Sequence, residues 1–261
     1  MIDAFIHAAA IADEQLLLNL KDFPWNPWLD DTRRMLDARN VERAGVCIMD
    51  ASILHRPHDL SILQHAIRTD RLWFYIVPNI AIDNAQIMSA SRAGFRGVIF
   101  HSYLQRIDRA HYSRVIDLAH AGVDCGMVPG FCTAYGSTAM YRYESLPLVA
   151  AFAEQCSAQT ILYHMGGARI LEALLLCEAW GQLILETSFS LPYWIGSSIE
   201  TDTAFAIRKL GAHRVMFGSD YPFIPMDTAI REHGDFFTRH SFEAADRNMI
   251  LDGTARSIFL T

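Results

Sequence analysis

The sequence predicts a single (β/α)8 barrel, the TIM-barrel class of α/β fold, spanning residues 1–261. Eight short runs rich in Val, Ile, Leu and Phe alternate with longer stretches of helical period, which is typical of βα units on a parallel sheet. A doubly wound sheet would more often have about five to seven strands and a Gly-rich dinucleotide turn. The chain has neither GxGxxG nor GxxxxGK[ST]. Its length also fits, because such barrels commonly fill ~250 residues as one domain.

The expected strands are mostly apolar throughout, as strands covered on both faces should be. In chain order they are residues 2–6, 45–49, 72–77, 97–101, 124–128, 160–164, 182–186 and 215–219. Between them the helical period predicts helices over 32–44, 59–69, 82–93, 109–121, 146–155, 169–178 and 201–210. Expected N-caps are Asp59, Asp83 and Asp108, and glycines that favour a helix end are Gly45, Gly94, Gly122 and Gly211.

Composition excludes several classes of function. The 22 Lys and Arg residues are fewer than the 29 Asp and Glu residues and are scattered, which argues against a nucleic-acid partner. The longest apolar stretch, 171–180, is interrupted by Glu172 and Glu178, so no membrane span is expected. The N-terminus has no basic region before its apolar residues, and the 5 cysteines form no CxxC. We therefore expect a cytoplasmic protein with reduced thiols.

Residues 129–145 form a long stretch after the expected fifth strand and carry four aromatic residues. A lid over the site and a structural Ω-loop are both open interpretations. Trp25 and Trp28, expected in the loop after the first strand, add further aromatic surface. Together these rings favour a flat or ring-bearing organic substrate.

Polar side chains stand where six of the expected strands end. They are His7, Asp50, His101, His164, Glu186 and Asp220. In a (β/α)8 barrel the chemistry lies at the C-terminal ends of the strands, so these groups should meet in one mouth. Partial burial and mutual charge there would tune histidines and carboxylates for proton transfer near neutral pH.

Four segments, in this order along the chain, resemble a known family. Residues 3–7 (DAFIH) are similar to the opening D-x-H-x-H of the amidohydrolase superfamily, and 94–101 (GFRGVIFH) to its strand-four segment. Residues 161–167 (ILYHMGG) resemble its strand-six histidine, and 217–222 (FGSDYP) its strand-eight aspartate. The closest resemblance is to the amidohydrolase 2 branch, which includes aminocarboxymuconate-semialdehyde decarboxylase and pyrone dicarboxylate lactonase.

The resemblance implies a metal site that this sequence keeps only in part. In metal-dependent members, two histidines of strand one, a histidine ending strand five and the strand-eight aspartate hold a divalent metal. Here Phe5 replaces the first histidine, and Val128 falls at the strand-five position in the expected alignment. Of the implied ligands His7 and Asp220 remain, whereas a catalytic zinc site ordinarily needs about three protein ligands. We therefore expect no cofactor, with a single zinc or manganese ion as the alternative.

By the same resemblance Asp220 is the base that activates water or removes a proton, and His164 is the acid or second base. The pKa of His164 would be raised if Asp220 lay within hydrogen-bond distance. Without a metal, His7 and His101 are the candidate donors to a developing oxyanion. Glu186 and Asp50 are either substrate contacts or solvated strand ends.

Three hypotheses about function follow. The first is a metal-independent enzyme that hydrolyses a lactone, ester or amide of a small organic acid, or cleaves a C–C bond beside a carboxylate, using Asp220, His164 and His7. The second is a metal-dependent hydrolase or decarboxylase with the ion held by His7, Asp220 and a recruited histidine. The third is a barrel that has lost catalysis and binds a small molecule. A small-molecule partner is expected in each case, and a homo-oligomer is compatible with the sequence.

Overall fold

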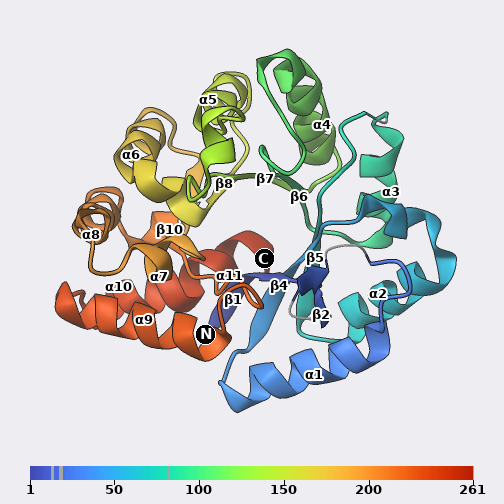
Figure 1. Ribbon diagram of the computed structural model, residues 1–261, viewed down its shortest axis with the longest axis horizontal. Coiled ribbons are helices and arrows are strands. Elements are labelled where there is room, and N and C mark those ends of the chain that lie inside the picture. Colours follow the sequence, from blue (N-terminus) through green and yellow to red (C-terminus); the bar gives the residue numbers. More distant parts are fainter. Residues whose placement is uncertain (13–14, 18–19, 82, 261) are drawn as a thin grey trace.

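The computed structural model describes residues 1–12, 15–17, 20–81 and 83–260. Eight parallel strands form one sheet in the order β1-β4-β5-β6-β7-β8-β9-β10, with helices outside it (Figure 1). The strands are β1 Ile2–His7, β4 Arg43–Ile48, β5 Leu72–Ile76, β6 Gly97–Phe100, β7 Val128–Cys132, β8 Thr160–Tyr163, β9 Leu183–Glu186 and β10 Val215–Met216. The (β/α)8 barrel expected from the sequence is confirmed.

The first and last strands meet through the segment that follows β10. A parallel bridge pairs Ile6 with Tyr221. The amide of Ala4 donates to the carbonyl of Phe217 at 2.9 Å, and that of His7 donates to Tyr221 at 2.7 Å. These bonds close the barrel and bring the residues after β10 beside the end of β1.

An outer ring of helices follows the strands (Figure 1). The α-helices are α1 Trp25–Ala38, α2 Pro57–Thr69, α3 Ala85–Ala93, α4 Tyr112–Asp124, α5 Leu146–Ala153, α6 Ile170–Ala179, α7 Ser190–Trp194, α8 Ser198–Leu210, α9 Met226–Arg239, α10 Ala244–Asn248 and α11 Thr254–Phe259. Short helical turns are η1 Ala51–His55, η2 Arg109–His111, η3 Thr138–Tyr141, η4 His164–Arg169, η5 Ala212–Arg214 and η6 Met249–Gly253, and a hairpin pairs β2 Ala10–Ala12 with β3 Gln15–Leu17. Within these described ranges, no helix is both long and apolar enough to cross a membrane.

The helices start and end close to the expected positions, with some local differences. Asp108 caps η2, whereas Asp59 lies inside α2 and pairs with Arg56 at 3.2 Å. Gly94 ends α3 in the left-handed conformation, as expected. The predicted helix over 82–93 begins with residue 82, which lies outside the described residues.

The helix expected over 32–44 is α1, which begins at Trp25 and ends at Ala38. It ends early because Asn40 adopts a left-handed conformation (φ 53°), which interrupts a helix. Trp25 and Trp28 therefore belong to α1 and not to a loop. Trp25 is buried, with its ring 4.6 Å from that of Phe23, so it does not serve as the exposed aromatic surface expected from the sequence.

The barrel has an aromatic interior that is closed at the N-terminal end. Phe5 packs on Tyr163 with ring centroids 4.4 Å apart, and Trp73 stacks on Phe259 of α11 at 5.0 Å. These rings belong to an interior cluster separate from the larger core between sheet and helices. Because these rings fill the N-terminal end of the barrel interior, its open end lies at the C-terminal ends of the strands.

The fifth strand was predicted wrongly. The expected strand over 124–128 is the end of α4 and a turn at Gly126, and β7 begins at Val128 and ends at Cys132. Proline and glycine at 129 and 130 signal a turn, yet both lie within β7. A Cβ on Gly130 would stand 2.4 Å from the Tyr163 ring, so the glycine makes room for a bulky interior neighbour.

Candidate functional site

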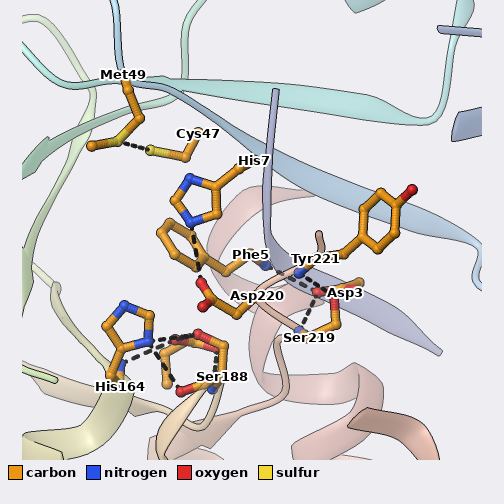
Figure 2. A network of polar contacts seen from close by, with 11 residues as sticks. Asp3, Phe5, His7, Cys47, Met49, His164, Ser188, Ser219, Asp220 and Tyr221 are labelled. Carbon is orange, nitrogen blue, oxygen red and sulfur yellow. Dashed lines mark hydrogen bonds and ion pairs between the residues drawn. The ribbon is translucent and has the colours of Figure 1, made fainter. Parts of the chain in front are cut away.

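Four of the predicted strand-end residues lie together at the C-terminal mouth of the barrel. His7 ends β1, His101 follows β6, His164 follows β8, and Asp220 lies in the turn after β10. All four are buried, with 4% to 7% of their surface exposed. Figure 2 shows His7, His164 and Asp220 directed toward one another around the ring of Phe5.

Asp220 is paired with His7. The Nε2 atom of His7 lies 3.1 Å from Asp220 Oδ1, and the backbone amide of Asp220 donates to the carbonyl of Phe5 at 2.9 Å. Because an ionised carboxylate can only accept, Nε2 of His7 carries a proton. The rise in the pKa of His164, which was expected if Asp220 lay within hydrogen-bond distance, does not occur: Asp220 bonds to His7, and the pKa of His164 is lowered by burial.

His164 and Asp220 share an unusual backbone conformation. Their φ angles are 65° and 64°, in the left-handed region. Non-glycine residues rarely adopt this region, although Asp and His do so more readily than most. Such residues cluster at functional sites, where the surrounding structure holds them in place. The turns after β8 and β10 therefore present these two side chains at the mouth.

The hydrogen bonds of His164 assign its neutral tautomer. Nδ1 lies 3.0 Å from the carbonyl oxygen of Ser188 and 2.9 Å from its hydroxyl. A carbonyl only accepts, so Nδ1 carries the proton and Nε2 keeps a lone pair. Burial lowers the pKa of His164, while the charge of Asp220 opposes that shift. The neutral imidazole thus presents an acceptor, which favours a base over an acid.

His101 is also held as a neutral ring. Burial, followed by the charges of His164 and His7, lowers its pKa to about 3. Its backbone amide donates to Gln105 Oε1 at 2.6 Å, and Gln105 Nε2 donates to the carbonyl of Pro78 at 2.6 Å. A neutral imidazole retains one N–H, so His101 can still donate a hydrogen bond, as predicted.

The corrected fifth strand changes the comparison with the family's metal site. Cys132, not Val128, ends β7, so Cys132 takes the place in the chain that the resemblance gives to the strand-five ligand. Burial raises the pKa of the Cys132 thiol to about 12, and the charge of Asp220 adds to this shift. Burial also raises the pKa of Cys47, which lies nearby. Both groups are therefore thiols at neutral pH and not nucleophilic thiolates.

The side chains at the mouth do not fit a divalent metal of the kind that the family implies. The Phe5 ring lies 4.8 Å from the ring of His7 and 5.5 Å from that of His164, so an apolar group stands between the two imidazoles. Throughout the described ranges, no group of three His, Cys, Asp or Glu side chains is placed to hold a metal ion. Asp220 and His7 are hydrogen-bonded to each other instead.

An aromatic ring from a loop packs on each of the three histidines. None of these three rings was predicted from the sequence to lie at the site. Tyr103 lies 4.4 Å from His101 between ring centroids. Phe223 lies 4.9 Å from His7, and Phe189 lies 5.9 Å from His164. All three come from the loops that follow strands, and Phe223 is 45% exposed. Their sequence signal was a ring two residues after His101, three after Asp220 and three after Glu186.

The remaining two predicted residues, Asp50 and Glu186, are held by local hydrogen bonds next to the mouth. Asp50 accepts from the amide of Ser52 at 3.0 Å and pairs with Arg56 at 3.1 Å, so it caps η1. Glu186 is fully buried beside His164, which contradicts a solvated strand end. Its oxygens accept from the amides of His164 and Ser188. For both residues a substrate contact stays a prediction.

The stretch after β7 is tied to the body of the barrel. The hydroxyl of Tyr135 accepts from the amides that begin α5, at 3.1 and 3.2 Å. Arg169 pairs with Glu144 at 2.8 Å and lies over the rings of Tyr135 and Tyr141. These contacts favour a structural loop over a lid.

A cavity of about 300 Å³ lies between the loops after β4, β5 and β6. Met49 lines it and also accepts a hydrogen bond from the thiol of Cys47, at 3.5 Å (Figure 2). Gln105, which holds the backbone of His101, lines it as well. The cavity therefore adjoins the histidine cluster, and its size suits a small organic molecule.

Below the mouth, Asp3 holds the turn that carries Asp220. Its Oδ1 accepts from the amides of Ser219 at 2.9 Å and Phe5 at 3.2 Å. Burial raises the pKa of Asp3 to about 7, and the charge of Asp220 adds to the rise. Because the folded pKa lies above the unfolded value, the stability contributed by the protonated acid is lost as the pH rises toward 7 and beyond.

Replacing Asp3 by asparagine should therefore change how stability depends on pH. Relative to the wild type, the Asp3→Asn variant should gain about 2 kcal/mol of unfolding free energy between about pH 5 and about pH 8.5. Urea unfolding at both pH values measures this difference. Asp235→Asn, at an exposed position of α9, is the matched control and should show no such trend. A difference that does not vary with pH would show that Asp3 is already charged in the folded protein.

Comparisons with known proteins agree with this architecture. Among solved structures, a probable 2-pyrone-4,6-dicarboxylic acid hydrolase from Acinetobacter baumannii, with citric acid bound, has a TM-score of 0.70 at 15% identity and covers 100% of this chain and 99% of its own. An amidohydrolase from Burkholderia multivorans with bound zinc has a TM-score of 0.65 at 17% identity, covering 99% and 98%. A 2,6-dihydroxybenzoate decarboxylase from Rhizobium has a TM-score of 0.55 at 17% identity, covering 88% of each chain.

At these identities the structural likeness shows the fold alone. No curated protein matches the sequence. The family model described as amidohydrolase, that of the amidohydrolase 2 group, matches residues 23–260. The match contains the segments around His101, His164 and Asp220, and it confirms at the level of the family the hydrolase or carbon–carbon lyase expected from the sequence. The chain belongs to the amidohydrolase family.

Proposed function

We propose that this protein is a metal-independent hydrolase that opens a lactone, or cleaves an ester or amide, of a small ring-bearing organic acid. The observation that carries the proposal is the arrangement of the mouth. A carboxylate bonded to His7 and an imidazole with a free Nε2 lone pair face one site, and Phe5 separates the two imidazoles. These groups can move protons without a bound ion.

In the proposed reaction, water attacks the carbonyl carbon of the substrate. Nε2 of His164 accepts a hydrogen bond from that water and orients it, and the Asp220 carboxylate takes its proton as the C–O bond forms. Asp220 then returns the proton to the leaving oxygen or nitrogen when the tetrahedral intermediate collapses. The N–H of His7 stabilises the Asp220 carboxylate before it takes the proton and again after it has returned it.

The oxyanion of the intermediate needs donors that stay protonated. Burial raises the pKa of the half-buried Tyr103 hydroxyl, and the charges of Cys132 and Asp220 add to the shift, so this group remains a donor. The N–H of neutral His101, whose ring packs on Tyr103, is the second candidate. His7 was expected from the sequence to be a donor to the oxyanion as well. It is not assigned that role, because its Nε2 proton is directed to Asp220.

The substrate class rests on shape. Tyr103, Phe189 and Phe223 surround the histidines with ring faces and edges, and the adjoining cavity of about 300 Å³ has room for a small ring. Aromatic walls of this kind favour flat substrates. The named activities of the structural neighbours, a pyrone dicarboxylic acid hydrolase and a dihydroxybenzoate decarboxylase, also concern ring compounds.

The proposal is tested with protein purified without a metal-affinity tag. Its metal content is measured by inductively coupled plasma mass spectrometry, and turnover of pyrone lactones, aryl esters and hydroxybenzoates is measured in chelator and after addition of zinc or manganese. We expect hydrolysis of a ring lactone or ester that chelator does not reduce. Activity that appears only with added metal, release of carbon dioxide from a hydroxybenzoate without hydrolysis, or binding of ring compounds without turnover would each overturn it.

A further inference from the structure

A second polar cluster lies beside His164, whose Nδ1 is directed to Ser188 (Figure 2). Glu186 ends β9 and Ser188 follows two residues later, and both are fully buried. The Glu186 carboxyl accepts from the amide of Ser188 at 2.7 Å, the hydroxyl of Ser188 at 2.7 Å and the amide of His164 at 3.2 Å. Buried polar groups are generally hydrogen-bonded, and these three donors are the partners of the Glu186 carboxyl.

These contacts form a directed chain of hydrogen bonds. The serine hydroxyl donates its hydrogen to Glu186, so its oxygen is free to accept from Nδ1 of His164 at 2.9 Å. The carbonyl of the same serine accepts from that Nδ1 at 3.0 Å. Both acceptors require the proton on Nδ1, which leaves Nε2 as the lone pair at the mouth.

We propose that Glu186 and Ser188 are positioning residues that fix His164 in its Nδ1–H tautomer, so that the Nε2 lone pair is available at the mouth to orient water. This rests on the proposed function, because it concerns the imidazole that orients the water. The carboxylate acts through the hydroxyl and does not touch the substrate. The carbonyl of Ser188 keeps the Nδ1 proton in place, so the chain polarises the imidazole without carrying that proton away.

A glycine in the neighbouring strand segment makes room for this carboxyl. A Cβ on Gly218 would stand 2.0 Å from Glu186 Oε1. No larger residue fits there while Glu186 keeps its bonds to His164 and Ser188. Gly218, two residues before Asp220, thus leaves the space that Glu186 occupies. The turn that carries Asp220 and the carboxyl that supports His164 are therefore packed against each other.

The charge of Glu186 decides the conditions of the test. Burial raises its pKa to about 8, although the surrounding donors from Ser188 and His164 favour the carboxylate. Spectra are therefore recorded at about pH 9, where the carboxylate prevails. Glu186→Gln keeps the shape but removes the charge. Its amide N–H can donate to Ser188 Oγ, which turns the serine hydrogen toward Nδ1 of His164.

The tautomer is read from the imidazole nitrogens by ¹⁵N NMR of the whole protein, with the His164 signals assigned by their loss in His164→Gln. We expect Nδ1–H in the wild type, a large fraction of Nε2–H in Glu186→Gln, and a return to Nδ1–H in the Glu186→Gln/Ser188→Ala double variant. Glu154→Gln, at an exposed position after α5, is the matched control. An unchanged tautomer in folded Glu186→Gln would overturn the proposal.

A second readout uses activity. At about pH 9, where the carboxylate prevails, loss of the Nε2 lone pair in Glu186→Gln should lower kcat while KM stays close to the wild-type value, because the oriented water is needed only in the chemical step. A kcat that stays unchanged while the tautomer changes would overturn the positioning role. Because the NMR measurement needs no substrate, failure of the proposed hydrolysis leaves its result interpretable.

Discussion

Replacement of Asp220 by asparagine should reduce kcat/KM by about 10³-fold while leaving the fold intact. A positioned acid or base contributes about 10² to 10⁴ to the rate, and Asp220 is proposed to serve in both steps of the reaction. The amide keeps an oxygen that can accept from Nε2 of His7, as Oδ1 does at 3.1 Å. It cannot take a proton from water, so the loss should lie in kcat more than in KM.

The control for this variant is Asp235→Asn, which removes an exposed carboxyl from α9 and should leave the rate unchanged. Thermal unfolding shows whether the left-handed turn at Asp220 tolerates asparagine, as its φ of 64° suggests it will. A decrease of less than tenfold in a stable variant would assign the proton transfer to another group. His164 would then be the candidate, because its Nε2 lone pair faces the same mouth.

Much of the barrel was predictable from the sequence because parallel strands covered on both faces are apolar throughout. Seven of the eight expected strands match the observed ones with ends displaced by up to three residues, and the expected fifth strand shares only Val128 with β7. The failure was β7, where Pro129 and Gly130 carry a turn signal inside a buried strand. Gly130 is present for the ring of Tyr163, which comes from a neighbouring strand. A contact of this kind leaves no local pattern in the sequence.

The residues that form the mouth were predictable in part. Strand ends converge in a barrel, so His7, His101, His164 and Asp220 could be assigned to one mouth from their positions alone. Their pairing could not be assigned, because it depends on the rotation of each strand and on the turn that follows it. Asp220 reaches His7 since the segment after β10 bonds along β1.

The groups that set the tautomer of His164 could not be predicted from the sequence. Ser188 acts through both a backbone carbonyl and a hydroxyl, and no sequence pattern marks that geometry. Asp50 caps η1 and also lines the cavity of about 300 Å³, so its position at a strand end does not decide between a structural role and a substrate contact. A polar residue at a strand end therefore predicts proximity to the mouth and leaves its role open.

Replacing Phe5 by histidine should create a metal site in this barrel. The phenyl ring stands between the imidazoles of His7 and His164, at the position where the resemblance places the first histidine ligand. An imidazole there, with His7 and Asp220, would supply about three ligands, the usual number for catalytic zinc. We expect Phe5→His to bind about one zinc ion per chain, and we expect the wild type to bind zinc weakly because it lacks this third ligand.

The measurement is zinc content after dialysis, together with thermal unfolding with and without zinc. Phe5→Leu is the matched control, because it also removes the ring contact with Tyr163 at 4.4 Å but adds no ligand. Both variants should lose stability from the altered interior, by about 1 to 3 kcal/mol. Zinc should restore stability in Phe5→His alone, since a ligand that binds only the folded state shifts the unfolding equilibrium.

The outcome separates two accounts of how the site departs from a metal centre. If Phe5→His binds zinc tightly and the wild type does not, one side chain accounts for the difference, and the thiol of Cys132 at the fifth-strand position is compatible with a metal site. If folded Phe5→His binds no zinc, the hydrogen bond between His7 and Asp220 holds these residues in a geometry that a third ligand does not overcome. In that case the lack of a metal site would be due to the backbone and not to one side chain. The cause would be the way β1 pairs with the turn after β10, where the backbone amide of Asp220 bonds to the carbonyl of Phe5.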